Sequence, residues 1–246
     1  MESVRSFIAK INNGGVCLGT GITFTDPTAT EALCDLFDFV WIDMEHNALS
    51  LEAVQGHLMA TKASRTVPLV RVPANDPTMI KRVLDIGAAG VIVPMIRTAQ
   101  EAALAVQACR YPPQGFRGIG PRRASNYGRS LGTDFFKNAN ENILTMVQIE
   151  HRDAVENLDG ILSVPGLSGI AIGRADLSAS MGYTGQWDHP EIVRICEGII
   201  RKALQTNVLV GMAGGDDPEI AGEWVRKGAQ WIQMGGDFSL MLRGAS

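Results

Sequence analysis

Residues 39–46 read FVWIDMEH, an apolar run that passes abruptly into charged residues. A nearly continuous apolar run is typical of a strand covered on both faces, which is the strand type of parallel α/β sheets. The charges stand where this strand should end, and burying a charge is costly unless it is paired or bound to a ligand. This one stretch therefore predicts both a parallel sheet and a functional edge.

Seven further runs of the same kind alternate with helical patterns along the chain. The eight expected strands are 16–20, 39–43, 68–72, 90–94, 144–150, 169–173, 207–211 and 231–235. Asp26, Asp76 and Asp217 each precede a proline, as an N-cap residue does at the start of a helix. We predict an α/β fold, a (β/α)8 TIM barrel that spans residues 1–246 as a single domain. A doubly wound open sheet is the alternative.

The overall composition excludes several classes of partner. Hydrophobic residues make up 46% of the chain, and the net charge of −4 provides no basic patch for nucleic acid or membranes. The four cysteines form no CxxC pair and are expected to be reduced thiols. No signal-peptide run and no apolar segment long enough to cross a bilayer is evident, so we expect a soluble cytoplasmic protein.

Charged residues follow several of the predicted strands, at the end where barrel enzymes place their catalytic groups. Glu150 and Asp176 are candidate metal ligands, because two carboxylates completed by water and substrate oxygens suit a hard ion such as Mg²⁺ or Mn²⁺. The alternative is that they form salt bridges with Arg71 or Arg174.

His46, Asp43 and Arg71 are the candidate catalytic residues. Asp43 could orient the His46 imidazole as a general base, although a histidine that caps a turn is the alternative. Arg71 could hold a carboxylate or stabilise a developing enolate oxygen, and its alternative is an ion pair between strands. All six lysines fall in helical or loop patterns, which argues against a Schiff base and favours metal-assisted enolisation.

Two other regions carry structural expectations. The segment 111–142 is long and rich in Gly, Pro, Arg and Asn, so we expect a loop over the active-site face. Only 11 residues follow Gly235, and an eighth helix barely fits there. We therefore expect another subunit to cover this end of the barrel.

Five motifs, taken in order, resemble the HpcH/HpaI family of metal-dependent 2-oxo-acid aldolases over nearly the whole chain. They are WIDMEH (41–46), VRVP (70–73), YPPQGFRG (111–118), QIE (148–150) and ADLS (175–178). The resemblance implies a class II pyruvate-type aldolase, a carbon–carbon lyase, with Mg²⁺, Mn²⁺ or Co²⁺ as its cofactor. The enzyme that the resemblance implies acts on a small 2-oxo acid and an aldehyde. It assembles as a homo-oligomer, a hexamer built from dimers that exchange a C-terminal helix.

The resemblance also implies roles for individual residues. Glu150 and Asp176 match the metal ligands, and Arg71 matches the residue that steadies the pyruvate enolate. His46 and Asp43 resemble the histidine–aspartate dyad that serves as the general base and acts through a water molecule. Three further residues resemble substrate-side groups: Gln148 as a substrate-binding or supporting residue, Ala175 as a backbone donor to the substrate carboxylate, and Asp85 as an acid that reaches a neighbouring subunit's site.

Some positions depart from the family pattern. They are Thr20 in place of a tryptophan, His151 in place of a small hydroxyl residue, Arg174 in place of a proline, and Met212-Ala213 in place of a bulkier aliphatic residue. These departures concern the aldehyde half of the substrate and leave the metal and enolate half intact.

The proposed reaction is cleavage or formation of a 4-hydroxy-2-oxo acid. The metal polarises the ketone, His46 with Asp43 removes the proton of the distal hydroxyl, and the C3–C4 bond breaks to give an aldehyde and an enolate held by Arg71. One alternative is an acyl-CoA lyase of the citrate lyase β-subunit type, with Arg122, Arg123 and Arg129 near the nucleotide. A non-catalytic barrel that only binds a small acid is another.

Overall fold

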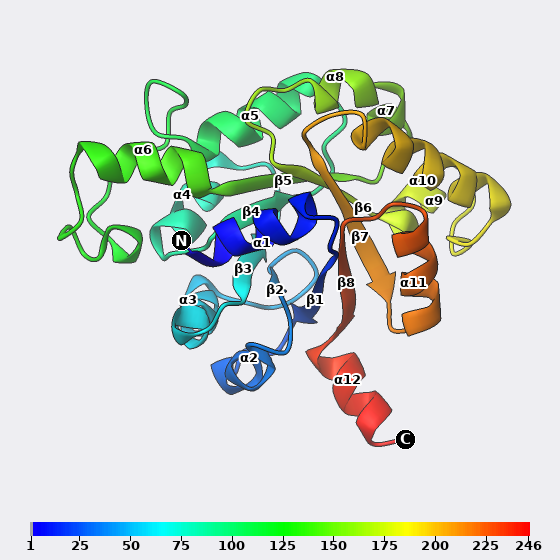
Figure 1. Ribbon diagram of the computed structural model, residues 1–246, viewed down its shortest axis with the longest axis horizontal. Helices are drawn as coiled ribbons and strands as arrows, with labels where there is room; N and C mark the ends of the chain where they lie inside the picture. The colour runs from blue at the N-terminus through cyan, green and yellow to red at the C-terminus, as the bar shows by residue number, and fades with distance from the viewer. Residues whose placement is uncertain (1) are drawn as a thin grey trace.

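Eight parallel strands close into a barrel in the computed structural model, which describes residues 2–246 (Figure 1). They are β1 (Cys17–Ile22), β2 (Phe39–Asp43), β3 (Val67–Arg71), β4 (Gly90–Val93), β5 (Leu144–Ile149), β6 (Gly169–Ile172), β7 (Leu209–Gly215) and β8 (Trp231–Gly236). Each strand pairs with the next in sequence, and β8 pairs back with β1. The predicted (β/α)8 barrel is confirmed, and the open sheet is excluded because the barrel closes.

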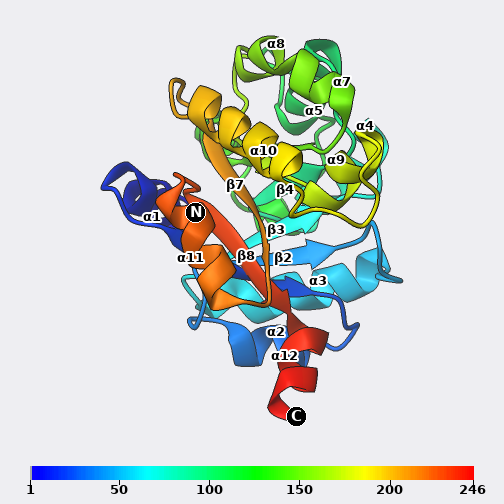
Figure 2. The same ribbon diagram turned by 90° about the vertical axis from the view of Figure 1, so that its right-hand side faces the viewer.

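Helices surround this barrel and cover its outer face (Figures 1 and 2). They are α1 (Glu2–Asn12), α2 (Pro27–Leu33), α3 (Leu51–Ala60), α4 (Pro77–Asp85), α5 (Ala99–Cys109), α6 (Thr133–Asn142), α7 (Arg152–Glu156), α8 (Leu158–Leu162), α9 (Arg174–Ser180), α10 (Pro190–Ala203), α11 (Pro218–Arg226) and α12 (Asp237–Gly244), with short 3-10 turns at Thr61–Ala63 and Arg123–Ser125. Across residues 2–246, none of these helices combines the length and apolar character that a bilayer crossing requires.

The predicted helix starts are confirmed in the structure. Asp26, Asp76 and Asp217 each accept a hydrogen bond from the backbone N–H two residues on, and each is followed by a proline in the first turn. The caps satisfy amides that have no partner inside the helix. Strand ends differ more from expectation: β1 continues to Ile22, and β7 runs over Leu209–Gly215 rather than 207–211.

The barrel interior is filled by large apolar side chains toward the N-terminal ends of the strands. Helix α1 lies across the N-terminal mouth and inserts Phe7 against Phe39, with ring centroids 5.9 Å apart. Phe39 in turn packs edge-to-face on Trp231 at 5.6 Å. A Cβ at Gly211 would lie 2.2 Å from the Trp231 ring, so glycine is required there. This packing closes one end of the barrel and leaves the other end for chemistry.

The segment that precedes α6 lies on the opposite side of the barrel from the one we expected. Arg123 donates hydrogen bonds to the carbonyls of Leu58 and Ile86, and Arg117 forms an ion pair with Asp85 at the end of α4. These partners precede strands β3 and β4, so they lie at the N-terminal face of the barrel. The prediction that this segment covers the active-site face is therefore wrong, because arginine bonds to the α3 and α4 ends hold it elsewhere.

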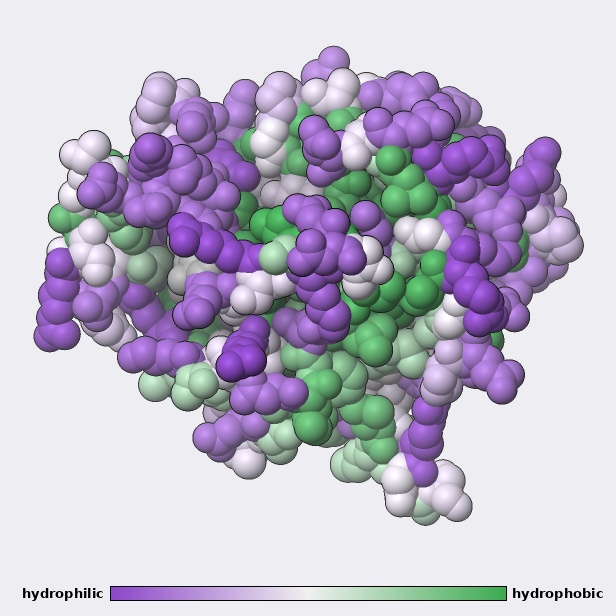
Figure 3. All heavy atoms as spheres, in the orientation of Figure 1, coloured by the Kyte–Doolittle hydropathy of each residue, from purple (hydrophilic) through white to green (hydrophobic). Residues whose placement is uncertain are grey.

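Helix α12 extends away from the barrel in both ribbon views (Figures 1 and 2). Its side chains Phe238, Met241 and Leu242 are 48%, 58% and 59% exposed. Figure 3 shows further hydrophobic surface gathered in the middle of the face that α1 crosses, with hydrophilic surface around its margin. The chain therefore does form a helix after the eighth strand, but the apolar residues of this helix are left largely uncovered.

Candidate active site

A cavity of about 580 Å³ opens at the C-terminal ends of the strands. Seven of the eight predicted site residues line it: Asp43, His46, Arg71, Gln148, Glu150, Ala175 and Asp176. The eighth, Asp85, lies at the end of α4 and pairs with Arg117 at 2.8 Å, on the opposite face of the barrel. The structure thus gathers residues from four strands around one cavity, as the strand-end rule predicts.

Arg71 is held by Asp43 in a two-pronged ion pair. The two residues stand side by side in the β2–β3 register, and Arg71 Nε and Nη2 each lie 2.8 Å from an oxygen of Asp43. Burial alone would raise the pKa of the Asp43 carboxyl, but the hydrogen bonds and charge of Arg71 outweigh it and hold that pKa below its usual range. The guanidinium also lies over the Trp41 ring, 5.3 Å from its centroid.

A chain of polar contacts leads from Arg71 to Glu150 across the rim. Arg71 Nη1 donates to Gln148 Oε1 at 3.3 Å, and Gln148 Nε2 donates to Glu150 Oε2 at 2.6 Å. The other Glu150 oxygen accepts the backbone N–H of Met95 at 2.6 Å. Met95 has a φ of 55°, an uncommon conformation for a side chain of this size, and such positions cluster at functional sites. The contacts fix the orientation of the Glu150 carboxylate.

Glu150 is a buried carboxylate with other acids beside it. Burial raises its pKa to about 7, against the opposing Met95 amide, and the charges of Glu45 and Asp176 add to the increase. At Gly173 a Cβ would lie 2.5 Å from Glu150 Oε2, so a glycine is required to seat the carboxylate. A carboxylate held in such surroundings is stabilised in its charged form by a cation.

Glu45 is a site residue that our sequence analysis quoted but gave no role. Its Oε2 lies 3.0 Å from Arg71 Nη1 as an ion pair, yet it is buried and has no aligned hydrogen-bond donor among the described residues. Burial raises the pKa of Glu45, against the charge of Arg71. The signal that could have found it is its position, two residues after Asp43 at the end of the same strand.

Asp43 was expected to orient His46, but no hydrogen bond from the His46 ring to Asp43 is formed between the residues described. Asp43 accepts from Arg71, from the Glu45 amide and from Asn47 Nδ2 at 2.6 Å, while His46 Nε2 lies 3.7 Å from Glu45 Oε2. A bidentate guanidinium bond is stronger than a bond to a neutral imidazole, which explains the outcome. The ion-pair alternative for Arg71 is thus the arrangement observed, while His46 is 62% exposed at the cavity.

The donors in the cavity fit a hard divalent cation. Glu150 and Asp176 both line it, and the charge of Asp176 adds to the rise in the pKa of Glu150. Among residues 2–246 no group of three His, Cys, Asp or Glu side chains is placed to hold a metal together. A cation here would therefore be held by two carboxylates and completed by water or substrate oxygens, which suits a catalytic Mg²⁺ or Mn²⁺ site.

The positions that depart from the family pattern lie at different distances from the cavity. Arg174 and Ala213 line it, whereas Thr20 and Met212 are buried. His151 caps α7 by accepting the Asp153 amide at 3.2 Å. Only two of these positions can therefore contact a substrate directly.

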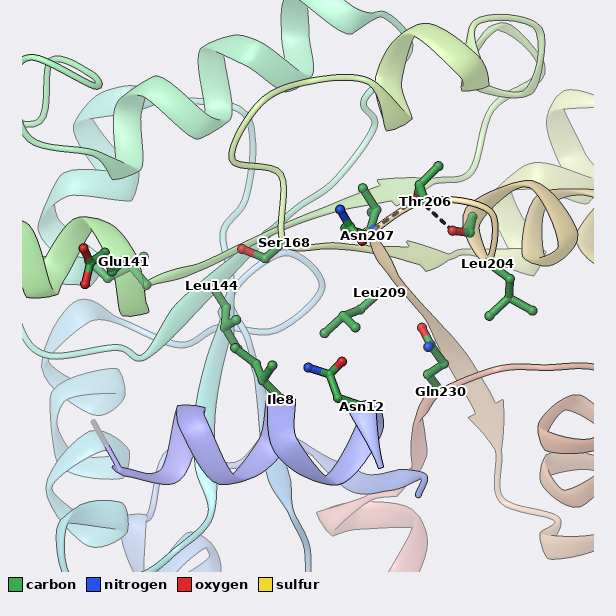
Figure 4. Close-up of a pocket in the computed structure, with 13 residues that line it drawn as sticks. Ile8, Asn12, Glu141, Leu144, Ser168, Leu204, Thr206, Asn207, Leu209 and Gln230 are labelled. Carbon is green, nitrogen blue, oxygen red and sulfur yellow. Dashed lines mark hydrogen bonds between the residues drawn. The ribbon is translucent and has the colours of Figure 1, made fainter. Parts of the chain in front are cut away.

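A second hollow of about 440 Å³ lies near the N-terminal mouth, beside α1 (Figure 4). Two of its polar side chains have local partners: Ser168 Oγ accepts from the Thr145 amide, and Thr206 Oγ1 donates to Ala203 O. It brings together neither the carboxylates nor Arg71. The chemistry therefore belongs to the cavity at the opposite end.

Comparison with known proteins points in one direction. A sequence model described as HpcH/HpaI aldolase/citrate lyase matches residues 25–243. The chain is 40% identical to a 4-hydroxy-2-oxo-heptane-1,7-dioate aldolase of Klebsiella pneumoniae, over 85% of this chain and 78% of that protein. It is 34% identical to a hydroxypyruvate/pyruvate aldolase of Roseobacter denitrificans, over 97% and 93%. An HpcH/HpaI aldolase/citrate lyase family structure from Burkholderia cenocepacia superposes with a TM-score of 0.91 at 31% identity, covering 98% and 96%.

Proposed function

The chain belongs to the HpcH/HpaI aldolase/citrate lyase family, and we propose that it is an aldolase that cleaves and forms 4-hydroxy-2-oxo acids. The products of cleavage are pyruvate, or a close 2-oxo acid, and an aldehyde. Membership confirms the resemblance that the five motifs indicated. The observation that carries the proposal is the contact chain Asp43–Arg71–Gln148–Glu150 beside Asp176, all facing one cavity.

A divalent cation is the cofactor of the proposed enzyme. Glu150 and Asp176 would hold it, and when bound it would supply Lewis-acid polarisation of the substrate ketone. Gln148 keeps Glu150 oriented through its 2.6 Å hydrogen bond, and the Met95 amide restrains the other oxygen. Supporting bonds of this kind orient carboxylate ligands and tune their affinity. We propose that Ala175, which lines the cavity, donates its backbone N–H to the substrate carboxylate.

Arg71 has the role of stabilising negative charge that develops on the oxo acid during C–C cleavage. Its orientation is set in advance by Asp43 and Glu45, so little reorganisation accompanies the reaction. We propose His46 as the group that removes the proton from the distal hydroxyl, directly or through water, with Glu45 as its neighbouring carboxylate. Asp43 then acts on the reaction through Arg71 rather than by orienting His46.

Two rival mechanisms have less support from the structure. The cavity-lining residues, all within the described part of the chain, include no lysine that could form a Schiff base. An acyl-CoA lyase would need free cations for the nucleotide, but Arg123 is used to bind two backbone carbonyls. Arg123 therefore serves the fold.

The decisive experiment is pyruvate release from a panel of 4-hydroxy-2-oxo acids, with Mg²⁺ or Mn²⁺ and with chelator. We expect turnover only with metal, and loss of turnover in Glu150→Gln. A chain that binds the acids without releasing pyruvate would instead be a binding protein. Release of product from a CoA thioester alone would favour the acyl-CoA lyase.

We also propose a homo-oligomer, in keeping with the exposed apolar residues of α12. A hexamer assembled from dimers is the arrangement to test. In such an assembly Asp85, which is remote from its own chain's cavity, would approach the cavity of a neighbouring subunit. The acid is held ready by Arg117, whose own guanidinium stacks on Tyr111 at 4.5 Å.

A further inference from the structure

Trp187 is a large aromatic side chain on the wall of the active-site cavity that the reaction above does not use. It lies in the loop between α9 and α10, and it is 45% exposed while lining the same cavity as Glu150 and Asp176. A tryptophan left half exposed at a concave site provides apolar area for a ligand. Its position on the cavity wall is not explained by binding of the oxo-acid half of the substrate.

The loop that carries Trp187 is braced at both ends. Next to the tryptophan, Asp188 accepts a 2.7 Å hydrogen bond from Arg174 Nη1. The Arg174 side chain is 10% exposed, and its guanidinium lies over the buried Trp224 ring of α11, 5.4 Å from the centroid. Within the loop itself, Tyr183 stacks on His189, with ring centroids 4.0 Å apart. These contacts restrain the loop on both sides of Trp187, which lowers the entropic cost of ordering it on binding.

The charges around the cavity indicate which aldehydes this wall accepts. The two arginines that line it are both paired, Arg71 with Asp43 and Arg174 with Asp188. Asp216, which directly follows β7, adds a further acid to the lining. A carboxylate at the far end of an aldehyde would meet acids and arginines that are already paired with acids, whereas an apolar chain would meet an indole ring.

We infer that Trp187 determines specificity for the aldehyde half, selecting uncharged aldehydes with an apolar or aromatic group, and that Arg174 and Asp188 are positioning residues for it. This inference rests on the proposed aldolase function. It differs from the preference that the name 4-hydroxy-2-oxo-heptane-1,7-dioate implies for a relative, since that substrate ends in a second carboxylate.

The test separates the two halves of the reaction. Exchange of the pyruvate methyl protons with D₂O, followed by NMR, reports enolisation without any aldehyde. Aldol addition to benzaldehyde, propanal and succinic semialdehyde reports the aldehyde half. We expect wild-type kcat/KM to be higher for the two uncharged aldehydes. Absence of methyl exchange in the wild-type enzyme would overturn the proposed function itself, separately from the inference about Trp187.

Substitutions then test whether Trp187 binds the aldehyde. In Trp187→Ala the ratio of benzaldehyde addition to methyl exchange should fall about tenfold, through a higher KM for the aldehyde. Phe116→Ala is the matched control, because Phe116 is 48% exposed on a different loop and does not line the cavity. An unchanged ratio in Trp187→Ala, or a preference of the wild-type enzyme for succinic semialdehyde, would overturn the inference.

The brace is tested with Arg174→Gln and Asp188→Asn. If both residues position Trp187, each variant should lower the same ratio, and neither should favour the charged aldehyde. If Arg174 instead binds an anionic substrate, Asp188→Asn would release it and lower the KM for succinic semialdehyde, which would contradict the positioning role. Arg194→Gln, which breaks an exposed ion pair with Glu191 on α10, is the control and should leave the ratio unchanged.

Discussion

At the scale of single residues, the site depends on how carboxylates are matched with cations. Asp43 and Glu45 share Arg71, while Glu150 has only amide donors and two neighbouring acids. Removing one partner of a buried ion pair leaves the other charge uncompensated. Arg71 and the two proposed metal ligands therefore call for different substitutions when their roles are tested.

For Arg71, we expect Arg71→Ala to lower kcat for pyruvate release by about 10²–10³, since one electrostatic contact to the developing charge is lost. Arg71→Lys keeps the charge and tests geometry, because an ammonium cannot reproduce the two-pronged bond to Asp43. Steady-state kinetics give kcat, and thermal unfolding of both variants checks that the barrel still folds. Unchanged kcat in a folded Arg71→Ala variant would remove Arg71 from the mechanism.

For Glu150, we expect Glu150→Gln to weaken Mn²⁺ binding by more than about 100-fold. The amide keeps an oxygen for the Met95 N–H, but its nitrogen cannot accept from Gln148 Nε2, so thermal unfolding must show that the variant still folds. Isothermal titration calorimetry with Mn²⁺ measures the affinity, and Asp176→Asn is the matched variant at the second ligand. Wild-type activity that persists in excess chelator would contradict the assignment of both residues.

At the scale of secondary structure elements, His57 of α3 ties the end of β1 to the helical layer. Its Nε2 lies 2.9 Å from Phe24 O and its Nδ1 lies 2.8 Å from Thr30 Oγ1. A carbonyl only accepts, so Nε2 carries the proton and Nδ1 accepts from the hydroxyl. A second proton, on Nδ1, would require the Thr30 hydroxyl to turn and accept, and would place a charge in a buried site. Burial lowers the pKa of His57, which agrees with this geometry.

This arrangement makes a prediction about stability in acid. Well above pH 6.5, the ordinary pKa of histidine, His57 is neutral in both the folded and unfolded states and contributes no pH dependence. As the pH falls through 6.5, His57 is protonated in the unfolded chain but stays neutral in the folded chain. The free energy of unfolding therefore decreases until the pH passes the pKa of His57 in the folded state. The slope is at most about 1.4 kcal/mol per pH unit.

The measurement is an NMR titration of the His57 Cε1–H, assigned with the variant His57→Gln. We expect a midpoint below 6.5 in the folded protein, and a smaller loss of stability between pH 7 and pH 5 in the variant. Urea unfolding at several pH values gives the second quantity. A midpoint at or above 6.5 would show that the ring accepts a second proton in place.

The elements were predictable from the sequence to different degrees. For β2 the prediction of 39–43 matches the observed bounds, because its apolar residues and terminal charge are local features. For β7 the prediction ended at 211, whereas the strand continues through Ala213 to Gly215. Glycine weakens strand propensity, and pairing with β8 overrides it here.

The contents of the site were predictable, but its pairings were not. Strand ends located Arg71 and Glu150, yet the Asp43–Arg71 bond depends on the β2–β3 register, which no local pattern encodes. The Met95 contact is made by a backbone amide in an unusual conformation, and its side chain carries no signal of it. Sequence reasoning therefore identified residue types at the rim and missed the hydrogen bonds that orient them.

At the scale of the whole molecule, one end of the barrel is closed by its own chain and the other carries the site. Helix α1 fills the N-terminal mouth, while α12 leaves β8 beside the cavity and extends outward (Figure 2). Asp237 at the start of α12 accepts from the amides of Thr23 and Phe24, at the end of β1. The direction of α12 is thus fixed at its base, next to the active-site rim.

The last prediction concerns this helix. Exposed apolar side chains on α12 are stabilised if another subunit covers them, so Met241→Asp should shift the assembly toward smaller species by placing a charge in that contact. Met59→Asp is a matched control, because Met59 on α3 is equally exposed at 58%. Sedimentation velocity measures the distribution of masses. Dissociation caused by Met59→Asp but not by Met241→Asp would place the subunit contact on α3 and not on α12.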